Sequence, residues 1–361
     1  MTMGRSVARA SVALAMTAAA VAVWAQPALA NPPCGTAVAS NLALTGNMVC
    51  AGTALVTAAD NIVIDLNGYT VSGNGTGDGI FVLHSKVTIR NGKLTGFENG
   101  IRMLGAGEGI PNENLVSRVT AVNNDEGIQL TDADHTTITD SLLQNNTTGL
   151  VLRVQSDRNR VVRTRILANV LGVLMHEGSD MNVVAENTIA KNKNGIKMIN
   201  ATEDNLVQGN TISGNIEAGV AIWGPGTNRN VVRSNQVSSN GVGIHVCCGL
   251  SLDKNQIVGN TVTFNAGTGI LVIDEAPDGT TVTDNLVRRN GFGQPLDPRK
   301  PGQYDDGIHV EAPVNAWATI ARNASDQNAD LGIEATGNIV DGGGNTAVGN
   351  GDPAQCVGVV C

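Results

Sequence analysis

A glycine followed by an aliphatic residue recurs eleven times along the 361-residue chain. The glycines of these pairs are Gly79, Gly100, Gly127, Gly149, Gly172, Gly195, Gly219, Gly243, Gly269, Gly307 and Gly332. They are 21 to 27 residues apart, except for one interval of 38 residues before Gly307. Near-constant spacing of this length is typical of repeat proteins, in which each repeat packs only against its neighbours. The repeat therefore predicts one continuous solenoid rather than separate globular domains.

Asparagines spaced five residues apart divide the central repeats into three parts. The triplets are Asn182, Asn187 and Asn192; Asn205, Asn210 and Asn215; Asn230, Asn235 and Asn240; and Asn255, Asn260 and Asn265. Stretches such as Val183-Val184 and Thr188-Ile189 lie between them, and β-branched residues favour strands. Three short strands per repeat, each ended by a polar turn, predict one coil of a parallel β-helix.

Side-chain alternation within these strands predicts which residues form the core. We expect Val184, Ile189, Ile196 and Met198 to point inward. The asparagines suit the corners because they tolerate left-handed backbone conformations and can bond otherwise unpaired backbone groups of the next coil.

Other repeat folds fit this sequence less well. Leucine-rich repeats need a regular leucine pattern, and propeller blades are about 40 residues long with a W-D mark. A left-handed β-helix has a strict hexapeptide period, which this sequence lacks. We therefore predict an all-β, single-stranded, right-handed parallel β-helix of about eleven or twelve coils, with three short strands per coil. It occupies residues 31–361, with an N-terminal cap at 31–60 and a C-terminal cap at 337–361.

Residues 1–30 have the features of a secretory signal peptide. Arg5 and Arg9 precede an apolar stretch at 10–24, and Ala28-Leu29-Ala30 provides a small-residue cleavage site. The apolar stretch is too short to span a bilayer. We expect cleavage near Ala30 and secretion of the mature protein without a membrane anchor.

Export places the six cysteines in an oxidising environment, where disulfides form. Cys34 and Cys50 lie close together at the mature N-terminus, and Cys356 and Cys361 lie at the C-terminus. We expect each of these pairs to form a disulfide that holds a chain end.

The adjacent Cys247 and Cys248 leave three possibilities open. They could form a vicinal disulfide, remain two buried thiols, or bind a metal together with His245. Most cysteines are structural unless their surroundings activate the thiol.

With this repeat, the chain resembles the pectate-lyase-like superfamily of right-handed parallel β-helix proteins. More narrowly, it is similar to exported β-helix repeat proteins associated with carbohydrate binding and sugar hydrolysis. The resemblance covers nearly the whole mature chain, and the segment I-D-L-N-G-Y-T-V-S-G at 64–73 resembles the first coil of such proteins. It implies a function on carbohydrates, although one fold hosts many different sites.

The catalytic signatures of this superfamily are present only in fragments. Asp305-Asp306 matches the D-D pair of polygalacturonase-like hydrolases, but their G-H-G and R-I-K are missing and only R-I-L stands at 165–167. The D-P-H of mannuronan epimerases has its nearest match in D-P-R at 297–299. The arginine-centred motifs of pectate lyases are not evident. These departures leave the reaction open between a lyase type, a hydrolase type and no catalysis.

Alternation also predicts two rows of outward side chains on the strand that follows each glycine. The first row reads Phe81, Arg102, Gln129, Val151, Leu174, Lys197, Ala221, His245, Leu271, His309 and Glu334. The second reads Leu83, Leu104, Thr131, Arg153, His176, Ile199, Trp223, Cys247, Ile273, Glu311 and Thr336. In the superfamily this face often carries the catalytic groove.

A substrate-binding strip is predicted on this face. It consists of Arg153, His176, Lys197, Trp223 and His245. The sequence from residue 153 to residue 197 contains eight Lys or Arg and only four acidic residues. Such a strip could neutralise the carboxylate of a uronate and supply a base, as lyase chemistry requires. The alternative is a solvated face with ion pairs between coils.

The long interval before Gly307 predicts a second candidate site. The proline-rich segment 291–304 should project as a loop, because Pro295, Pro298 and Pro301 interrupt a strand, and such loops often carry function. Directly after it stand Asp305, Asp306, His309 and Glu311, which could act as acid and base or bind a cation. The alternative is a tolerated surface insertion followed by an ordinary aspartate turn.

These features favour an exported protein that binds or processes an extracellular polysaccharide, which could be anionic. The alternatives are a non-catalytic structural or adhesive protein of the cell envelope and a metal-handling accessory protein. The formal charge of −9 excludes a bulk binder of nucleic acid. We expect a monomer, and the sequence assigns no cofactor.

Overall fold

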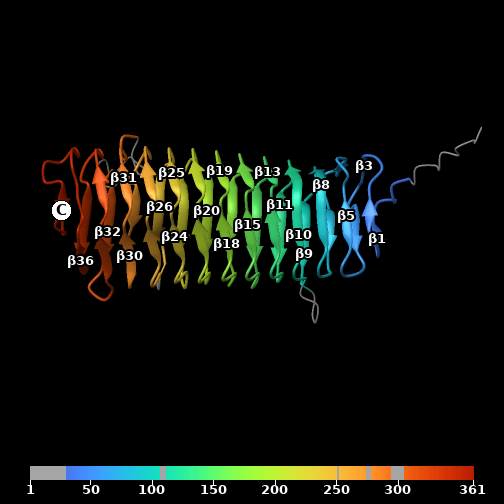
Figure 1. Cartoon of the computed structure of the whole chain (residues 1–361), viewed down its shortest axis with the longest axis horizontal. Coiled ribbons are helices and arrows are strands. Elements are labelled where there is room, and N and C mark those ends of the chain that lie inside the picture. Colours follow the sequence, from blue (N-terminus) through green and yellow to red (C-terminus); the bar gives the residue numbers. More distant parts are fainter. Residues whose placement is uncertain (1–29, 106–110, 250–251, 274–277, 294–304) are drawn as a thin grey trace, which may run out of the picture.

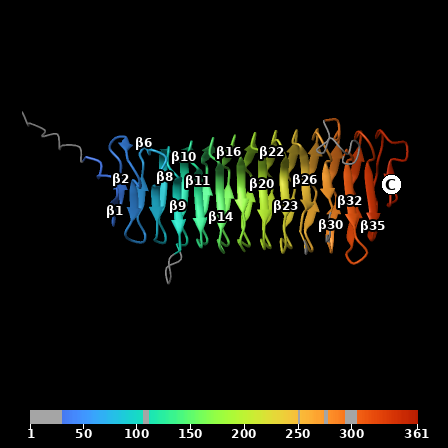
Figure 2. The ribbon, with the colours of Figure 1, turned by 180° about the vertical axis from the view of Figure 1, so that it is seen from behind.

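The computed structural model describes residues 30–105, 111–249, 252–273, 278–293 and 305–361. It is a straight rod of stacked coils, with β1 (Thr36–Val38) near one end and the C-terminus at the other (Figures 1 and 2). Every regular element in these ranges is a strand, and the strands of successive coils pair in parallel. The predicted all-β parallel β-helix is thereby confirmed. In the same ranges, no helix is long and apolar enough to cross a membrane.

The strand that follows each repeated glycine belongs to one continuous 14-stranded sheet, which we call sheet 1. Its strands are β1 (Thr36–Val38), β4 (Leu55–Thr57), β7 (Asp78–Val82), β9 (Asn99–Leu104), β11 (Glu126–Thr131), β14 (Thr148–Arg153), β17 (Leu171–Met175), β20 (Asn194–Ile199), β23 (Ala218–Trp223), β26 (Val242–Cys247), β29 (Ile270–Val272), β32 (Ile308–Ala312), β35 (Ile333–Gly337) and β37 (Cys356–Val357).

The other two strands of each coil form two further stacks that share the long strands β8 (Thr88–Thr95) and β10 (Leu115–Val122). Sheet 2 adds β2 (Leu42–Ala43), β5 (Val63–Asp65), β12 (Thr137–Thr139), β15 (Arg160–Val162), β18 (Val183–Ala185), β21 (Leu206–Gln208), β24 (Val231–Arg233), β27 (Gln256–Val258), β30 (Thr280–Thr283), β33 (Ala318–Ala321) and β36 (Ile339–Gly343). Sheet 3 adds β3 (Met48–Val49), β6 (Thr70–Ser72), β13 (Leu142–Gln144), β16 (Arg165–Leu167), β19 (Thr188–Ala190), β22 (Thr211–Ser213), β25 (Gln236–Ser238), β28 (Thr261–Thr263), β31 (Leu286–Arg288) and β34 (Ala324–Asp326). Three strands per coil is what the asparagine spacing predicts.

The core consists of aliphatic side chains stacked from coil to coil. Val184, Ile189, Ile196 and Met198 are fully buried, as the alternation predicts. Ile196 pairs in register with Val173 of the preceding coil and with an equally buried aliphatic residue of the next. Identical side-chain positions therefore pack above one another along the rod, so no coil buries its core faces alone.

Close approach of successive coils explains the repeated glycine of sheet 1. A Cβ at Gly219 would lie 2.7 Å from the carbonyl oxygen of Gly243 and 3.0 Å from the Nδ2 atom of Asn240. A side chain at this position would therefore push the coils apart. The glycine is required by space, since its own φ is not among the positive values.

The asparagines form hydrogen-bonded ladders along the rod. Asn215 accepts two bonds at Oδ1, from the backbone N–H and the Nδ2 of Asn192, both at 3.0 Å. Its own Nδ2 donates to Asn240 Oδ1 at 2.9 Å and to the carbonyl of Ile189 at 3.3 Å. One such ladder runs unbroken through Asn124, Asn146, Asn169, Asn192, Asn215, Asn240, Asn265, Asn290, Asn328 and Asn350.

The expected left-handed conformation of these asparagines is wrong. The residue before each ladder position has the positive φ instead, as in Glu186 at 57° before Asn187 and Lys191 at 59° before Asn192. The corner turns at that preceding residue, which leaves the asparagine free to point inward between coils. Only the second reason for asparagine, bonding of buried backbone groups, applies here.

All six cysteines are paired. The predicted Cys34–Cys50 and Cys356–Cys361 bonds are confirmed and close the first and last coils. Cys247 and Cys248 form a disulfide, which decides among the three possibilities left by the sequence. This bond removes the two thiolates that the metal-handling alternative requires as ligands.

Replacing a ladder asparagine should destabilise the rod far more than replacing a surface asparagine. Asn215→Ala leaves the backbone N–H of Asn192 and the carbonyl of Ile189 without their buried partner. We expect a loss of about 1–3 kcal/mol in the free energy of unfolding, measured by chemical denaturation. Asn74→Ala is the control, because Asn74 is exposed and bonds only Thr76. Equal stability of the two variants would contradict the structural role of the ladder.

Candidate functional site

The predicted first outward row of sheet 1 matches the strand register. The pairs run from Lys197 to Ala221, to His245, to Leu271, to His309 and to Glu334. In the second row, Trp223 pairs with Cys247. The predicted basic strip and the predicted acidic cluster therefore lie on one face of the rod. Four coil steps of about 4.8 Å separate Lys197 from His309.

This face is packed more tightly than a freely solvated surface. Ala221 is fully buried and Leu271 is 1% exposed, although both point away from the core. All five residues of the predicted strip, from Arg153 to His245, are half-buried. Their polar groups are thus partly desolvated before any ligand arrives, which strengthens electrostatic contacts made there.

Lys197, Trp223 and His245 form one contact group. The Lys197 Nζ lies 4.1 Å from the centre of the Trp223 ring, a cation–π contact, and burial lowers the pKa of Lys197. The His245 ring meets Trp223 edge-on, with 5.5 Å between ring centres. The Trp223 Nε1 is buried and has no hydrogen-bond partner in the described part of the chain. The group offers a ligand an aromatic side chain and a cation, while the indole N–H itself is covered.

Arg153 and His176 form a second, separate pair in the strip. Arg153 Nε donates to Thr131 Oγ1 at 3.1 Å, and His176 Nδ1 lies 3.5 Å from the carboxylate of Glu177. Burial lowers the pKa of His176, the Arg153 charge acts in the same direction, and Glu177 opposes them. A neutral imidazole beside a guanidinium can act as a base next to a bound anion.

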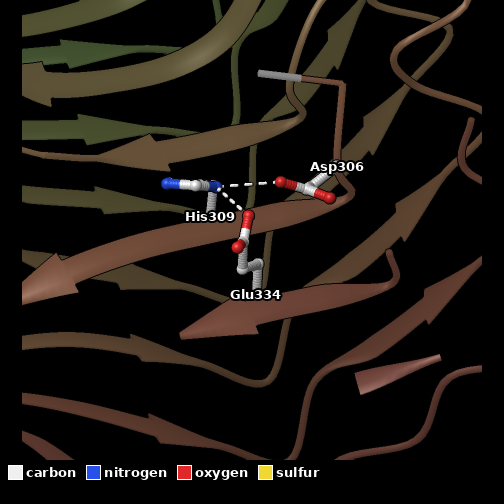
Figure 3. Close-up of side chains that lie close together, drawn as sticks. All are labelled: Asp306, His309 and Glu334. Atoms are coloured by element: carbon white, nitrogen blue, oxygen red, sulfur yellow. Dashed lines mark hydrogen bonds and ion pairs between the residues drawn. The ribbon is translucent and has the colours of Figure 1, made fainter. Parts of the chain in front are cut away.

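A cluster of titratable groups surrounds His309 on β32 (Figure 3). Its Nδ1 lies 2.8 Å from a carboxylate oxygen of Asp306 and 2.8 Å from one of Glu334. Its Nε2 lies 3.0 Å from Glu311 Oε1. Asp306, 1% exposed, also accepts the backbone N–H of Leu331 at 3.0 Å. One buried imidazole thus bridges three carboxylates from two adjacent coils.

Burial and mutual contacts shift the ionisation of this cluster. Burial acts to lower the pKa of His309, but the bonds to Asp306 and Glu311 and the charge of Glu334 outweigh it and raise the pKa to about 9. His309 is therefore an imidazolium at neutral pH. Burial, reinforced by the Asp306 carboxylate, raises the pKa of Glu334, although His309 opposes it. The cluster combines a buried cation with a carboxyl group that retains its proton more readily than usual.

Of the four residues predicted after the loop, Asp306 and Glu311 both contact His309, at opposite ring nitrogens. Asp305 faces Asp306 and Asp330 instead, and burial raises the pKa of Asp305. Sequence reasoning placed Glu334 beside His309 in the outward row but did not assign it to the site. Asp330 carried no signal, because it stands in the turn before β35.

Two sets of atoms lie close enough to hold a cation, the first only after His309 has lost its proton, because an imidazolium has no free lone pair. The potential ligand atoms of Asp306, His309 and Glu334 lie within 4.8 Å of one another, and so do those of Asp305, Asp306 and Asp330. Carboxylate oxygens are the ligands preferred by calcium and magnesium. Of the predicted loop, residues 294–304 lie outside the described residues, as does the signal peptide except for Ala30.

The family model for the right handed beta helix region matches residues 52–212 and 199–312. The chain belongs to the right-handed β-helix family. A comparison with curated protein sequences finds no match.

Solved structures with the same architecture cover most of this β-helix protein. The A-module of the Azotobacter vinelandii mannuronan C-5 epimerase AlgE4 aligns with a TM-score of 0.59 and 16% identity, over 90% of this chain and 89% of that chain. The catalytic unit of a Streptomyces thermodiastaticus GH87 α-1,3-glucanase aligns with a TM-score of 0.57 and 16% identity, over 85% of this chain and 61% of that chain. The Dettilon tailspike protein aligns with a TM-score of 0.56 and 15% identity, over 86% of this chain and 61% of that chain. The chain thus spans about three fifths of the glucanase unit and of the tailspike.

The raised pKa of His309 predicts a pH-dependent stability. Because the folded value of about 9 exceeds the ordinary 6.5, protonation favours the folded state. This contribution, about 3 kcal/mol, is complete below pH 6.5 and is lost as the pH rises through 9. Unfolding titrations between pH 6 and 10 should show the loss in the native protein and not in His309→Gln.

His135→Asn provides the control for this experiment. His135 is exposed, so the substitution should leave the pH dependence unchanged. An unaltered alkaline loss of stability in His309→Gln would assign the effect to another group.

Proposed function

We propose that this β-helix protein binds an extracellular polysaccharide on the outer face of sheet 1 and hydrolyses it at the His309 cluster. The observation that carries the proposal is the placement of two accessible carboxyl groups around one buried imidazole. Glu334 contacts Nδ1 of His309 and has 32% of its side chain exposed. Glu311 contacts Nε2 of His309 and has 45% of its side chain exposed. Both can reach a bound ligand, whereas Asp306 cannot, because it is 1% exposed.

Hydrolysis of a glycosidic bond needs one carboxyl group that donates a proton and one that accepts a proton. Glu334, whose pKa is raised, is suited to protonate the glycosidic oxygen as the bond to the anomeric carbon breaks. A water attacks that carbon and gives its proton to Glu311. The imidazole between the two carboxyl groups favours the wide separation of inverting enzymes, about 6.5–9.5 Å, over the narrow separation of retaining ones.

Asp306 and His309 act as positioning residues in this proposal. The imidazolium bonds Glu311 on one side and Glu334 on the other, which fixes both carboxyl groups. The buried Asp306 holds the ring at Nδ1 and raises the pKa of Glu334. Preorganised groups of this kind need no rearrangement when charge develops in the reaction.

Two further observations support a polysaccharide substrate outside the cell. Two of the proteins with the same architecture are a mannuronan epimerase and an α-1,3-glucanase, and both names specify a polysaccharide substrate. All six cysteines are bonded, as is typical of an oxidising compartment. Together with the predicted signal peptide at 1–30, they favour secretion.

A lyase-type or epimerase-type reaction at Arg153 and His176 is the second candidate. The pKa of His176 is lowered by burial and by Arg153, so the imidazole is neutral and can accept a proton. Arg153 would neutralise the carboxylate of a uronate and make the neighbouring C–H more acidic. Cleavage of this type leaves an unsaturated product, whereas hydrolysis leaves a new reducing end.

The hydrolase proposal is tested by replacing the two accessible carboxyl groups. Glu334→Gln and Glu311→Gln should each lower turnover by about 100-fold or more, because each removes a proton-transfer group. The measurement is release of reducing ends from a panel of neutral and uronate polysaccharides. Glu186→Gln is the control, since Glu186 is exposed at the corner between β18 and β19, outside both candidate sites. Unsaturated products that vanish in His176→Ala would replace hydrolysis by the lyase reaction.

The binding strip is tested by charge removal on different faces of the rod. Arg153→Ala with Lys197→Ala should weaken binding of an anionic polysaccharide, and binding by the native protein should fall with added salt. The matched control is Arg160→Ala with Arg165→Ala, which removes the same charge from exposed positions on sheets 2 and 3. Affinity electrophoresis at several salt concentrations measures the difference. Equal losses in the two double variants would show that only total charge matters.

A further inference from the structure

An open groove lies at the corner between sheet 3 and sheet 1, near the C-terminal end of the rod. It has a volume of about 670 Å³ and is lined by Phe264, Arg289, Phe292 and Gln327, among others. A smaller cavity of about 380 Å³ adjoins it and shares Phe264, Arg289 and Gln327. The larger volume lies within the usual range for a small-ligand site, about 300–1,000 Å³.

The groove exposes aromatic rings that the fold does not need. The chain has only four phenylalanines. Phe97 is 2% exposed and belongs to the core, but Phe264 is 55% exposed and Phe292 is 68% exposed. Both of these exposed rings line the groove. Neither contributes an aromatic ring to the hydrophobic core, so their presence here calls for another explanation.

Phe264 occupies an unfavourable backbone position for an aromatic residue. Its φ is 57°, in the left-handed region where bulky side chains are uncommon. The equivalent residue of the preceding coil is Ser239, at the same φ of 57°, since each stands directly before a ladder asparagine. The corner therefore accepts a small polar residue, and a phenylalanine is not required for folding.

Arg289 is held over this aromatic surface in a fixed orientation. Its guanidinium carbon lies 5.5 Å from the centre of the Phe264 ring, and its Nε donates to Gln327 Oε1 at 2.9 Å. Unlike Arg288, which pairs with Asp326, Arg289 has no carboxylate partner among the described residues. Its two terminal nitrogens can therefore receive a carboxylate in the bidentate geometry that arginine favours.

The groove adjoins the His309 cluster through the backbone. Gly291, next to Phe292, packs so closely on Asp305 that a Cβ at Gly291 would lie 2.6 Å from the Asp305 carbonyl carbon. Asp305 directly precedes Asp306 of the cluster. The groove and the cluster are therefore neighbours in the fold.

We propose that this groove is a subsite for a uronate residue of the polysaccharide. The apolar face of the pyranose ring packs against Phe264 and Phe292, and its carboxylate binds the terminal nitrogens of Arg289. This inference rests on the proposed polysaccharide function and adds the class of sugar. A carboxylate binds at the arginine corner because the carboxylates around His309 would repel it.

The test measures binding directly, so that it does not depend on turnover. Arg289→Gln should lower the affinity for a uronate oligosaccharide at least about tenfold, which is 1.4 kcal/mol, in isothermal titration. It should leave a neutral oligosaccharide of equal length unaffected. Phe264→Ser, which copies Ser239, should weaken both ligands. Arg322→Gln is the control, because Arg322 is a surface arginine paired with Asp284, away from the groove.

Each outcome assigns the failure to one proposal. Uronate binding that is unchanged in Arg289→Gln and Phe264→Ser overturns the subsite, even if Glu334→Gln has lost turnover. An equal loss for neutral and uronate ligands in Arg289→Gln overturns the uronate preference. If both groove variants lose uronate binding, the subsite is supported. If Glu334→Gln retains turnover in the same experiment, the proposal of hydrolysis at the His309 cluster is overturned. A native protein that binds neither ligand overturns both proposals.

Discussion

Hydrogen bonding between successive coils is the constraint on which the whole molecule depends. Each ladder asparagine bonds the coil before it and the coil after it, as Asn215 does with Asn192 and Asn240. The repeated glycine of sheet 1 allows this approach, because a side chain there would collide with the next coil. A single coil can neither bury its core faces nor satisfy its corner backbone groups. Stability is therefore a property of the stack.

The same stacking creates the chemistry on the outer face. His309 and Glu334 are direct register partners on β32 and β35, so an imidazole and a carboxyl group 25 positions apart in the chain meet at 2.8 Å. A stack spaced by about 4.8 Å brings outward side chains of like position into contact whatever their charge. Near one part of the row, Lys197 makes a cation–π contact with Trp223. Further along, the acidic residues lie so close together that the pKa of Glu334 is raised. The rod is thus one scaffold with different local sites.

The parts of the site that could be predicted are those governed by strict alternation. His309 and Glu311 alternate on β32, whereas Asp306 precedes that strand and was included because it stands three residues before His309. The groove could not be found in this way. Phe264, Arg289 and Gln327 belong to three coils and stand at corners, where the positive φ of each residue itself, and not a strand period, directs its side chain. The bond between Cys247 and Cys248 was equally beyond the sequence, because adjacency alone does not determine oxidation.

The sequence by itself determined the solenoid, its three strands per coil, its inward aliphatic columns and its terminal disulfides. The first three follow from a local period that is repeated many times, and the disulfides follow from cysteines that stand close together near each end of the chain. The tertiary structure decided how far the outward residues are buried, which carboxylates meet His309 and where two phenylalanines remain exposed. Those features depend on distances between side chains of different coils. No local period encodes such distances, because they are set only when the coils close on one another.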